Sequence, residues 1–265
     1  MDLCESFQLL SYHIWDVIAD SRVIKYQIQE ETFTDIIIFY LKKFHSELQT
    51  IGFNKREEGV NGADWEWWFT DGLGKWIGFR VQAKVLDIDS ERFGHLYYRK
   101  DKASLAQYDK LISEAAADPL YPCIPLYAMY LQHATYPEAA VLRPHTSNKH
   151  YGCSVVSAYK VRSAKAARKS NRLRDWQGDI IPWHELVCHK RGAGSGLVDH
   201  INRLATNNFL NGQAVERSFI ISEPPSYISQ AAQSDRLFVS AEENPHNLAG
   251  AVVFRNSIEE NNSHS

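Results

Sequence analysis

Three polar side chains stand at strand spacing within two strongly apolar stretches of the chain. Asp64 begins the tryptophan-rich stretch 64–70, and Gln82 and Lys84 lie in the stretch 75–86. Residues two apart in a strand point to the same face, so the amide of Gln82 and the ammonium of Lys84 share one side. Carboxylate and amide oxygens can hold Mg²⁺ (or Mn²⁺), and a lysine can stabilise the charge that develops on phosphate. The set therefore suits metal-dependent phosphodiester hydrolysis.

Hydrophobic patterning predicts the elements that would position these residues. The stretch 64–70 and the stretch 75–86 are expected to pair as a hairpin, because the turn residues Asp71-Gly72-Leu73-Gly74 separate them. We expect further strands over about 53–58, 124–131, 152–161 and 249–254, and helices over about 3–20, 30–49, 103–117 and 197–209.

The order of these elements predicts an α/β fold. Its core reads αβββαβ: a helix leads a three-strand meander, and a crossover helix then carries the chain to a parallel strand. A mixed central sheet flanked by helices is expected. We assign residues 1–212 to this core with its N-terminal helix and residues 213–265 to a C-terminal extension packed on it, the last residues being disordered. The segment 197–258 could be a dimerisation arm, a sensor for a partner or the remaining edge of the sheet.

A helix acid, then Gly62-x-Asp64, then Gln82-x-Lys84 on the next strand resembles the PD-(D/E)xK nuclease superfamily. The Gln-x-Lys variant is similar to the branch that includes Mrr-type restriction enzymes, and the resemblance covers residues 28–165. It implies a restriction-endonuclease-like fold in which Asp64 and Gln82 are metal ligands and Lys84 is the catalytic lysine. Gln82 stands where the commoner pattern has an acid, and a neutral amide supplies an oxygen but no charge.

The superfamily often places a further acid on the first core helix, where this chain offers Glu30 and Glu31. Glu30 lies on the apolar stripe of Phe33, Ile37 and Leu41, which faces the sheet. Glu31 lies about 100° around the helix. Glu30 is therefore predicted as a catalytic residue and metal ligand, with Glu31 in reserve. The alternative is that both acids only complement the positive helix N-terminus.

Two other polar residues could support such a site. Glu66 shares a face with Asp64 by strand alternation and could contact the metal or a second ion, although a solvated strand acid is the alternative. Gln107 flanks the apolar stripe of the crossover helix. The resemblance implies that a polar residue there touches the site, and core packing is the alternative reading.

A basic segment is the electrostatic indication of substrate. No acid interrupts it before Asp175, and Lys165, Arg168, Lys169 and Arg172 would fall on one face of a helix. Such a face could bind a nucleic-acid backbone without sequence preference, whereas a solvated charged loop is the alternative. The predicted nucleic-acid-binding residues are Lys160, Arg162, Lys165, Arg168, Lys169 and Arg172.

Composition narrows the setting. The formal net charge is −3, so nucleic-acid binding needs a local patch. The four cysteines are spread along the chain without a C-x-x-C pair, which argues against a disulfide framework or a thiolate zinc site and favours a reducing cytoplasm. No basic region precedes an apolar one at the start of the chain, and the apolar run 36–41 is too short to span a bilayer. We therefore expect a cytoplasmic protein without a membrane segment.

Two hypotheses follow. The first is a divalent-metal-dependent endonuclease acting on DNA, with RNA as the alternative substrate. The resemblance sets it in prokaryotic restriction or anti-phage defence, with a defence-system protein as a candidate further partner. The second is a catalytically inactive nuclease-fold module that binds nucleic acid or a protein, and that assembles as a homodimer through its many tryptophans.

Overall fold

A computed structural model describes residues 1–53, 65–72, 74–133, 147–176, 178–189, 196–210, 218–233, 238–239 and 248–255. Three residues of the first motif, Gly62, Ala63 and Asp64, lie outside the described residues, and so does Leu73 of the expected turn. The same holds for residues 256–265, for which disorder was expected.

The helices follow the predicted order. Helix α1 begins with a capping box, because the Asp2 carboxylate accepts from Glu5 N at 2.8 Å and the Glu5 carboxylate accepts from Asp2 N at 3.0 Å. The α-helices are α1 (Leu3–Ile24), α2 (Glu30–Phe44), α3 (Gln107–Ala115), α4 (Ala158–Ala166), α5 (Leu197–Asn208) and α6 (Ser226–Gln233). Short 3₁₀ turns are η2 (Asn148–Gly152), η3 (Leu173–Asp175) and η4 (Trp183–Leu186).

The described strands form one mixed sheet in the order β6-β5-β4-β3-β2-β8-β1-β7. They are β1 (Gln49–Phe53), β2 (Trp65–Thr70), β3 (Trp76–Val85), β4 (Cys123–Tyr130), β5 (Cys153–Ser157), β6 (Ile181–Pro182), β7 (Phe238–Val239) and β8 (Gly250–Arg255). Strands β2 and β3 pair antiparallel, and α3 crosses over to β4, which is parallel to β3. The expected hairpin and parallel crossover are confirmed, and the protein is α/β with helices on the sheet.

The prediction that the first three strands form a meander is wrong. Strand β8 lies between β1 and β2, antiparallel to β1 and parallel to β2. Gly250 permits this insertion, because a Cβ there would lie 2.2 Å from the Trp65 ring. A strand that enters from the far end of the chain leaves no signal in the local sequence order. The C-terminal segment therefore contributes a central strand to the sheet and does not only pack on its outside.

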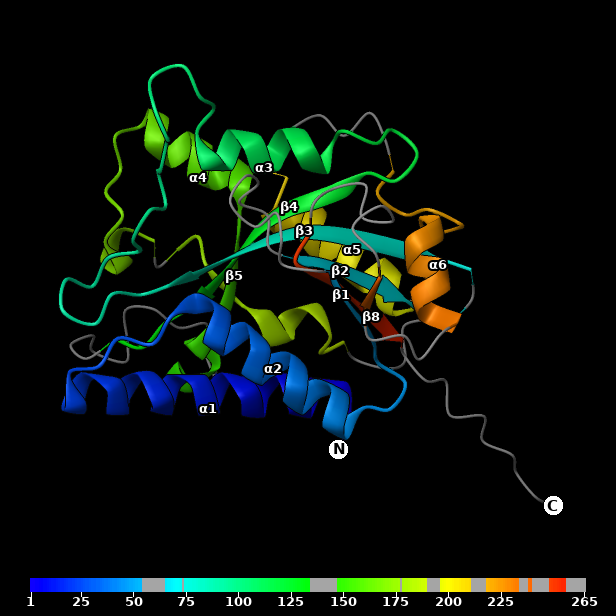
Figure 1. Ribbon diagram of the computed structural model, residues 1–265, viewed down its shortest axis with the longest axis horizontal. Coiled ribbons are helices and arrows are strands. Elements are labelled where there is room, and N and C mark those ends of the chain that lie inside the picture. The colour runs from blue at the N-terminus through cyan, green and yellow to red at the C-terminus, as the bar shows by residue number, and fades with distance from the viewer. Residues whose placement is uncertain are drawn as a thin grey trace.

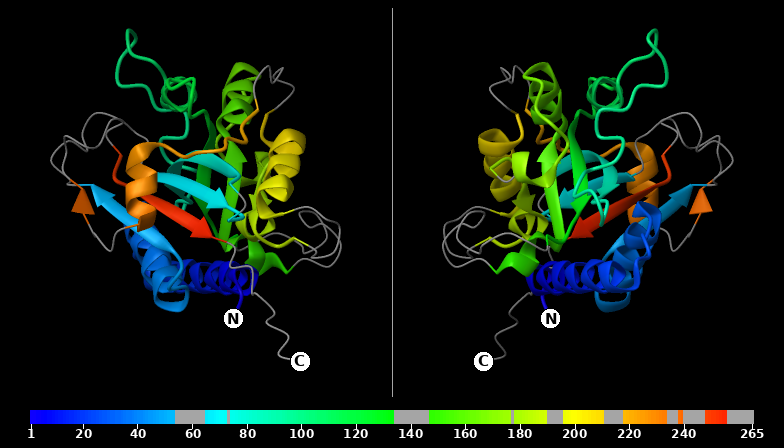
Figure 2. Two further views of the ribbon diagram at one scale, coloured as in Figure 1. Left: turned by 90° about the vertical axis from the view of Figure 1, so that its right-hand side faces the viewer. Right: turned by 90° about the vertical axis from the view of Figure 1, so that its left-hand side faces the viewer.

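Helices cover both faces of the sheet. Helices α1, α2 and α5 share one apolar core with it, while α3 and α4 line a second cluster and α6 a third. Figure 1 shows α1 and α2 on one side of the sheet and α3 and α4 on the other. Figure 2 shows α5 and α6 on opposite sides.

The tryptophans belong to these cores and do not form a surface. Five of them are buried, and Trp65 and Trp76 are partly buried and pack against core clusters. Burying these large rings stabilises the single chain, and the expected homodimer stays a prediction.

Candidate active site

The candidate site lies where β3 continues past the described part of β2. The last pair between these strands is Trp65 with Val81. Gln82, Ala83, Lys84 and Val85 pair with β4 and, within the described ranges, with no strand on their other side. The edge of β3 beside Gln82 and Lys84 therefore has no described strand next to it.

Lys84 is buried and forms an ion pair with Glu30. Its Nζ lies 3.1 Å from Glu30 Oε1, and the lysine side chain is only 4% exposed. The same Nζ donates to Ala83 O at 2.8 Å. An ammonium carries three N–H donors, so two have acceptors among the described residues and the third can serve a water or a phosphate oxygen.

Helix α2 brings Glu30 to this point because its first turn is fixed on the sheet. Thr34 Oγ1 donates to Glu30 O at 3.0 Å and lies 2.9 Å from the hydroxyl of Tyr130. Tyr130 pairs with Val85 on β3, one residue past Lys84. Glu31 is exposed. The helical phase that selected Glu30 over Glu31 agrees with this arrangement, whereas the metal-binding role of Glu30 stays a prediction.

Gln82 carries a buried polar atom without a described partner. Its side chain is 2% exposed, and Oε1 makes no hydrogen bond within the part of the chain that the structure describes. A buried amide oxygen without a partner costs about 1–3 kcal/mol, so such an atom calls for an explanation. Strand alternation places Gln82 and Lys84 on one face of β3, opposite the core residues Val81 and Ala83.

Gln107 stands at the first position of α3 and points to the same end of β3. Arg80 and Glu114 fix how α3 runs over the strand, since their ion pair measures 3.4 Å. From Glu114 back to Gln107 is about 10 Å along a helix, and from Arg80 on to Lys84 is about 13 Å along a strand. Because α3 runs antiparallel to β3, Gln107 lies toward Lys84. Its Oε1 is also buried without a described hydrogen bond.

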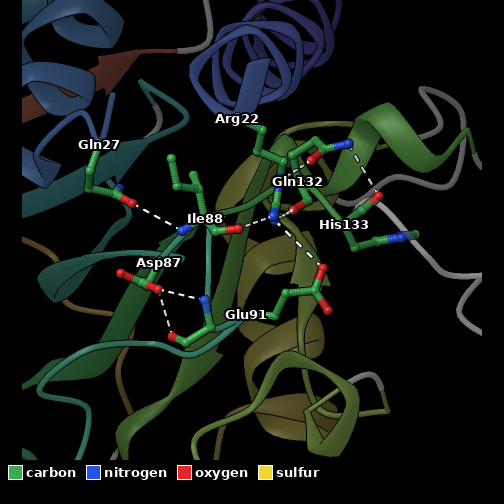
Figure 3. A network of polar contacts seen from close by, with 8 residues as sticks. Arg22, Gln27, Asp87, Ile88, Glu91, Gln132 and His133 are labelled. Atoms are coloured by element: carbon green, nitrogen blue, oxygen red, sulfur yellow. Dashed lines mark hydrogen bonds and ion pairs between the residues drawn. The ribbon is translucent and has the colours of Figure 1, made fainter. Parts of the chain in front are cut away.

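A polar network braces the two segments that carry Glu30 and Lys84 (Figure 3). Gln27, three residues before Glu30, accepts from Ile88 N at 3.0 Å. Arg22 at the end of α1 donates to Ile88 O, and also to Gln132 Oε1 and O, both at 2.7 Å. The connection before Glu30 is thereby tied to the segment that follows β3. Sequence reasoning missed this brace because its partners are backbone atoms and amides far apart in the chain.

Glu66 is not at this point. Its carboxylate is buried and accepts from Trp68 Nε1 at 2.9 Å and from the Tyr227 hydroxyl at 2.6 Å. Arg80 Nη1 lies 3.3 Å from its other oxygen. Burial, followed by the Glu66 charge, raises the pKa of Tyr227, so the phenol stays a neutral donor. Both oxygens of Glu66 are engaged in this buried network, and the expectation of a solvated strand acid is wrong.

Metal-ligand chemistry fits the candidate residues in type. Gln82 Oε1 and the Glu30 carboxylate are the hard oxygen donors that Mg²⁺ prefers. Within the described residues no three His, Cys, Asp or Glu side chains gather where they could hold a metal ion. Among the predicted ligands this statement concerns Glu30 alone, because Asp64 lies outside the described residues and Gln82 is an amide.

The basic segment differs from the expected helical face. Helix α4 ends at Ala166, and Arg168 has a left-handed φ of 57°, so Arg168, Lys169 and Arg172 are not on its surface. Asp179 neutralises part of the positive charge of this segment, because its carboxylate lies 3.7 Å from Lys160 Nζ and 2.6 Å from Lys169 Nζ. Arg162, Lys165, Arg168 and Arg172 have no ion pair among the described residues.

The cysteines also differ from expectation. Cys4 and Cys188 form a disulfide across 184 residues of sequence, with their Cα atoms 4.8 Å apart. Their meeting depends on the packing of α1 against the segment after η4, which spacing alone does not reveal. Disulfides are typical of oxidising compartments, so this bond counts against the expected cytoplasm. Cys123 and Cys153 are free and buried, and burial raises the pKa of both thiols.

None of the described helices has the length and apolar character needed to cross a bilayer. No curated protein and no solved structure matches the chain. One family model matches residues 3–260, almost the whole chain. The protein therefore belongs to DUF6615, a family of unknown function.

Proposed function

We propose that this protein is a divalent-metal-dependent nuclease that hydrolyses phosphodiester bonds, with DNA as the favoured substrate. The proposed site consists of Glu30, Asp64, Gln82 and Lys84. The proposal combines two supports, which are the family resemblance of the motif and the arrangement of side chains at the end of β3. A setting in prokaryotic restriction or anti-phage defence belongs to the same proposal and depends on the resemblance alone.

The orphaned oxygen of Gln82 is the observation that carries the proposal. It is buried without a described hydrogen bond, two residues from a buried lysine that is paired with a carboxylate. A purely structural amide in this position would be expected to find a donor. A bound cation would satisfy the oxygen and would also explain why acid and amide oxygens stand near one ammonium.

Chain connectivity supports the inclusion of Asp64. Asp64 is bonded to Trp65, and the partner of Trp65 on β3 is Val81, the neighbour of Gln82. The motif residue Asp64 therefore directly precedes, in sequence, a strand whose first described residue pairs beside Gln82. Asp64 would then supply a negative charge that Gln82 lacks.

The chain's own residues have separable tasks in this reaction. Glu30, Asp64 and Gln82 would hold the ion, which, when bound, would polarise the phosphate and lower the pKa of a water. Lys84 presents its remaining N–H to the substrate, where it can orient a water and stabilise negative charge on phosphate. Glu30 and Ala83 O keep that ammonium in place.

A second candidate is a nuclease-fold module without catalysis that binds nucleic acid or a protein. One observation favours it. Lys84 and Glu30 already neutralise each other's charge, and Gln82 contributes no charge to a cation site. Under this reading the pair only fastens α2 to β3, and metal ions change nothing.

Cleavage assays with matched variants test the proposal. Purified protein is incubated with supercoiled plasmid, linear duplex and RNA in Mg²⁺, Mn²⁺ or EDTA. Lys84→Met keeps the side-chain length but removes the charge, and should lower the cleavage rate by about 10²–10³-fold. Asp64→Asn should do the same, and Glu30→Gln should exceed its neighbour Glu31→Gln in effect. Thermal unfolding of each variant monitors the fold.

Lys75→Met is the control for lysine loss, because Lys75 is ion-paired with Asp199 at 2.9 Å next to β3 but away from the site. It should cleave at the wild-type rate. Full activity in Lys84→Met or Asp64→Asn, or equal cleavage in EDTA, would refute the proposal. Binding without cleavage under every condition would favour the inactive module.

A further inference from the structure

A second group of cations adjoins the basic segment, and it lies in the loop between β3 and α3, residues 86–106. Arg99, Lys100 and Lys102 are all exposed, and no ion pair involves them within the described ranges. The carboxylate among them, Asp101, accepts from the backbone and hydroxyl of Ser104 at 2.7 and 2.8 Å, and these bonds lower its pKa. Asp101 is therefore occupied in shaping the loop.

This loop is docked on the basic segment. Phe93 N donates to Asn171 O at 2.9 Å, and Leu173 N donates to Glu91 O at 3.0 Å. Lys165 Nζ lies 4.9 Å from the centre of the Tyr97 ring. Figure 1 shows the loop rising from the end of β3 beside α4. The two groups of cations thus belong to one surface, although some sixty residues separate them in sequence.

The start of α3 contacts the loop that carries the second group of cations. Gln107 N donates to Tyr98 O at 2.9 Å, which fixes the loop's far end to the helix. Burial and then Asp109 raise the pKa of Tyr108, and the charges of Arg99 and Arg162 oppose that rise. Arg99 from the loop and Arg162 from α4 thus act electrostatically on the same phenol.

Cations of this surface cover three of its aromatic rings, Tyr97, Tyr159 and Trp176, whereas Tyr98 is 47% exposed. The Arg162 guanidinium lies 5.4 Å from the centre of the Tyr159 ring, and Lys169 Nζ lies 5.0 Å from that of Trp176. Proteins that bind single strands use open aromatic faces on which successive bases stack. A surface that offers charge and covered rings is suited instead to the phosphates of a double helix.

We propose that this surface binds the phosphate backbone of a DNA duplex. Nucleic acid as the ligand class rests on the proposed function. The loop begins two residues after Lys84, and Gln107 directly follows its last residue. A duplex held here would therefore lie next to the candidate site. The cations that bind it are Arg99, Lys100, Lys102, Arg162, Lys165, Arg168 and Arg172.

Fluorescence anisotropy in EDTA measures this binding without cleavage. The probes are a short labelled DNA duplex, one of its strands, and an RNA duplex of the same sequence. The triple variant Arg99→Gln/Lys100→Gln/Lys102→Gln should bind the DNA duplex about tenfold or more weakly at 0.1 M salt. The slope of log affinity against log salt should fall by about 2–3 in magnitude.

The control triple variant, Lys25→Gln/Lys42→Gln/Lys43→Gln, removes the same charge from exposed positions at the end of α1 and on α2. It should bind as the wild type does, and the wild type should prefer the DNA duplex to the single strand and to the RNA duplex. Equal losses in both triple variants, a preference for either other probe, or no binding would overturn the inference. Loop-dependent binding of the DNA duplex by the wild type, with no cleavage in Mg²⁺ or Mn²⁺, would reject the nuclease and leave this inference standing.

Discussion

Strand β3 carries two buried polar clusters that differ in how their atoms are satisfied. Around Arg80, both oxygens of Glu66 have partners, and a tyrosine from α6 and a glutamate from α3 converge on the pair. The α3 glutamate, Glu114, is ion-paired with Arg80 through Oε2, although that oxygen makes no described hydrogen bond. Two residues further along the strand, the amide oxygen of Gln82 has no described hydrogen bond, and the nearby Lys84 has a spare donor.

The contrast separates a structural network from a candidate functional one. A buried ion pair with extra hydrogen bonds fastens elements together, and removing one partner leaves an uncompensated charge. A buried polar atom without a hydrogen bond lowers the free energy of unfolding. Such an atom is therefore expected where another group is to be bound. The Arg80 cluster joins β2, β3, α3 and α6, whereas the Gln82–Lys84 end is suited to a ligand.

The largest effect on stability is expected at the Arg80 cluster. Glu66→Gln should lower the free energy of unfolding by about 3 kcal/mol, because Arg80 is then buried with less opposing charge. Denaturant unfolding followed by circular dichroism measures this loss. Tyr227→Phe keeps the ring but removes one donor, and should cost about 1 kcal/mol.

Asp16→Asn is the matched control for loss of a paired carboxylate. Asp16 pairs with Lys149 at 2.7 Å, but both side chains are about half exposed, so the change should cost less than about 1 kcal/mol. If Glu66→Gln and Asp16→Asn are equally mild, the Arg80 cluster does not have the structural role assigned to it.

A third cluster shows that a buried polar atom without a described hydrogen bond does not by itself mark a ligand site. His184 of η4 and His150 of η2 are in ring contact at 4.4 Å, and the Nδ1 atom of each lacks a described hydrogen bond. Tyr12 of α1 contacts His150 Nε2 at 3.0 Å. Burial and then the neighbouring His150 lower the pKa of His184 to about 4, and burial also lowers the pKa of His150. These rings are kept neutral, and among the described residues no third His, Cys, Asp or Glu joins them to form a metal site.

Stability should therefore fall in acid through His184. The folded pKa is about 4 against 6.5 for the free side chain, so the unfolded chain binds more protons between these values. The contribution is fully present above pH 6.5 and is lost as the pH falls toward 4, by about 2 kcal/mol. Urea unfolding across this range measures it, and subtraction of the curve for His184→Phe isolates it. Parallel curves for the two proteins would contradict the prediction.

The local parts of the fold could be predicted from the sequence, and the non-local parts could not. The hairpin of β2 and β3, the crossover to β4 and the choice of Glu30 follow from periodicity over a few residues. The insertion of β8, the Cys4–Cys188 disulfide and the approach of Tyr227 to Glu66 join segments that are 161 to 184 residues apart, or that come from opposite ends of the chain. No local pattern encodes such meetings.

The candidate site shows the same division. Gln82 and Lys84 were found because they are polar residues at strand spacing. Arg80 has that spacing too, yet its role depends on Glu66 and Glu114, which alternation along one strand cannot supply. The loop cations Arg99, Lys100 and Lys102 were missed because Asp101 interrupts them and no helical or strand period marks their stretch. Only the docking of their loop on the basic segment makes them part of a surface.

The smallest effect on stability, and the sharpest contrast with Glu66, is expected for Gln82→Met. Methionine has a similar length but no unsatisfied oxygen, so the free energy of unfolding in EDTA should stay unchanged or rise by up to about 1 kcal/mol. Because a ligand that binds only the folded state stabilises it, Mg²⁺ should raise the melting temperature of the wild type and not that of Gln82→Met. Gln107→Met, which removes the other orphaned oxygen, should retain most of the Mg²⁺ effect if Gln107 lies beside the ion and does not hold it. A clear loss of stability in Gln82→Met without Mg²⁺ would mean that its oxygen has a structural partner, and the difference between the two clusters of β3 would disappear.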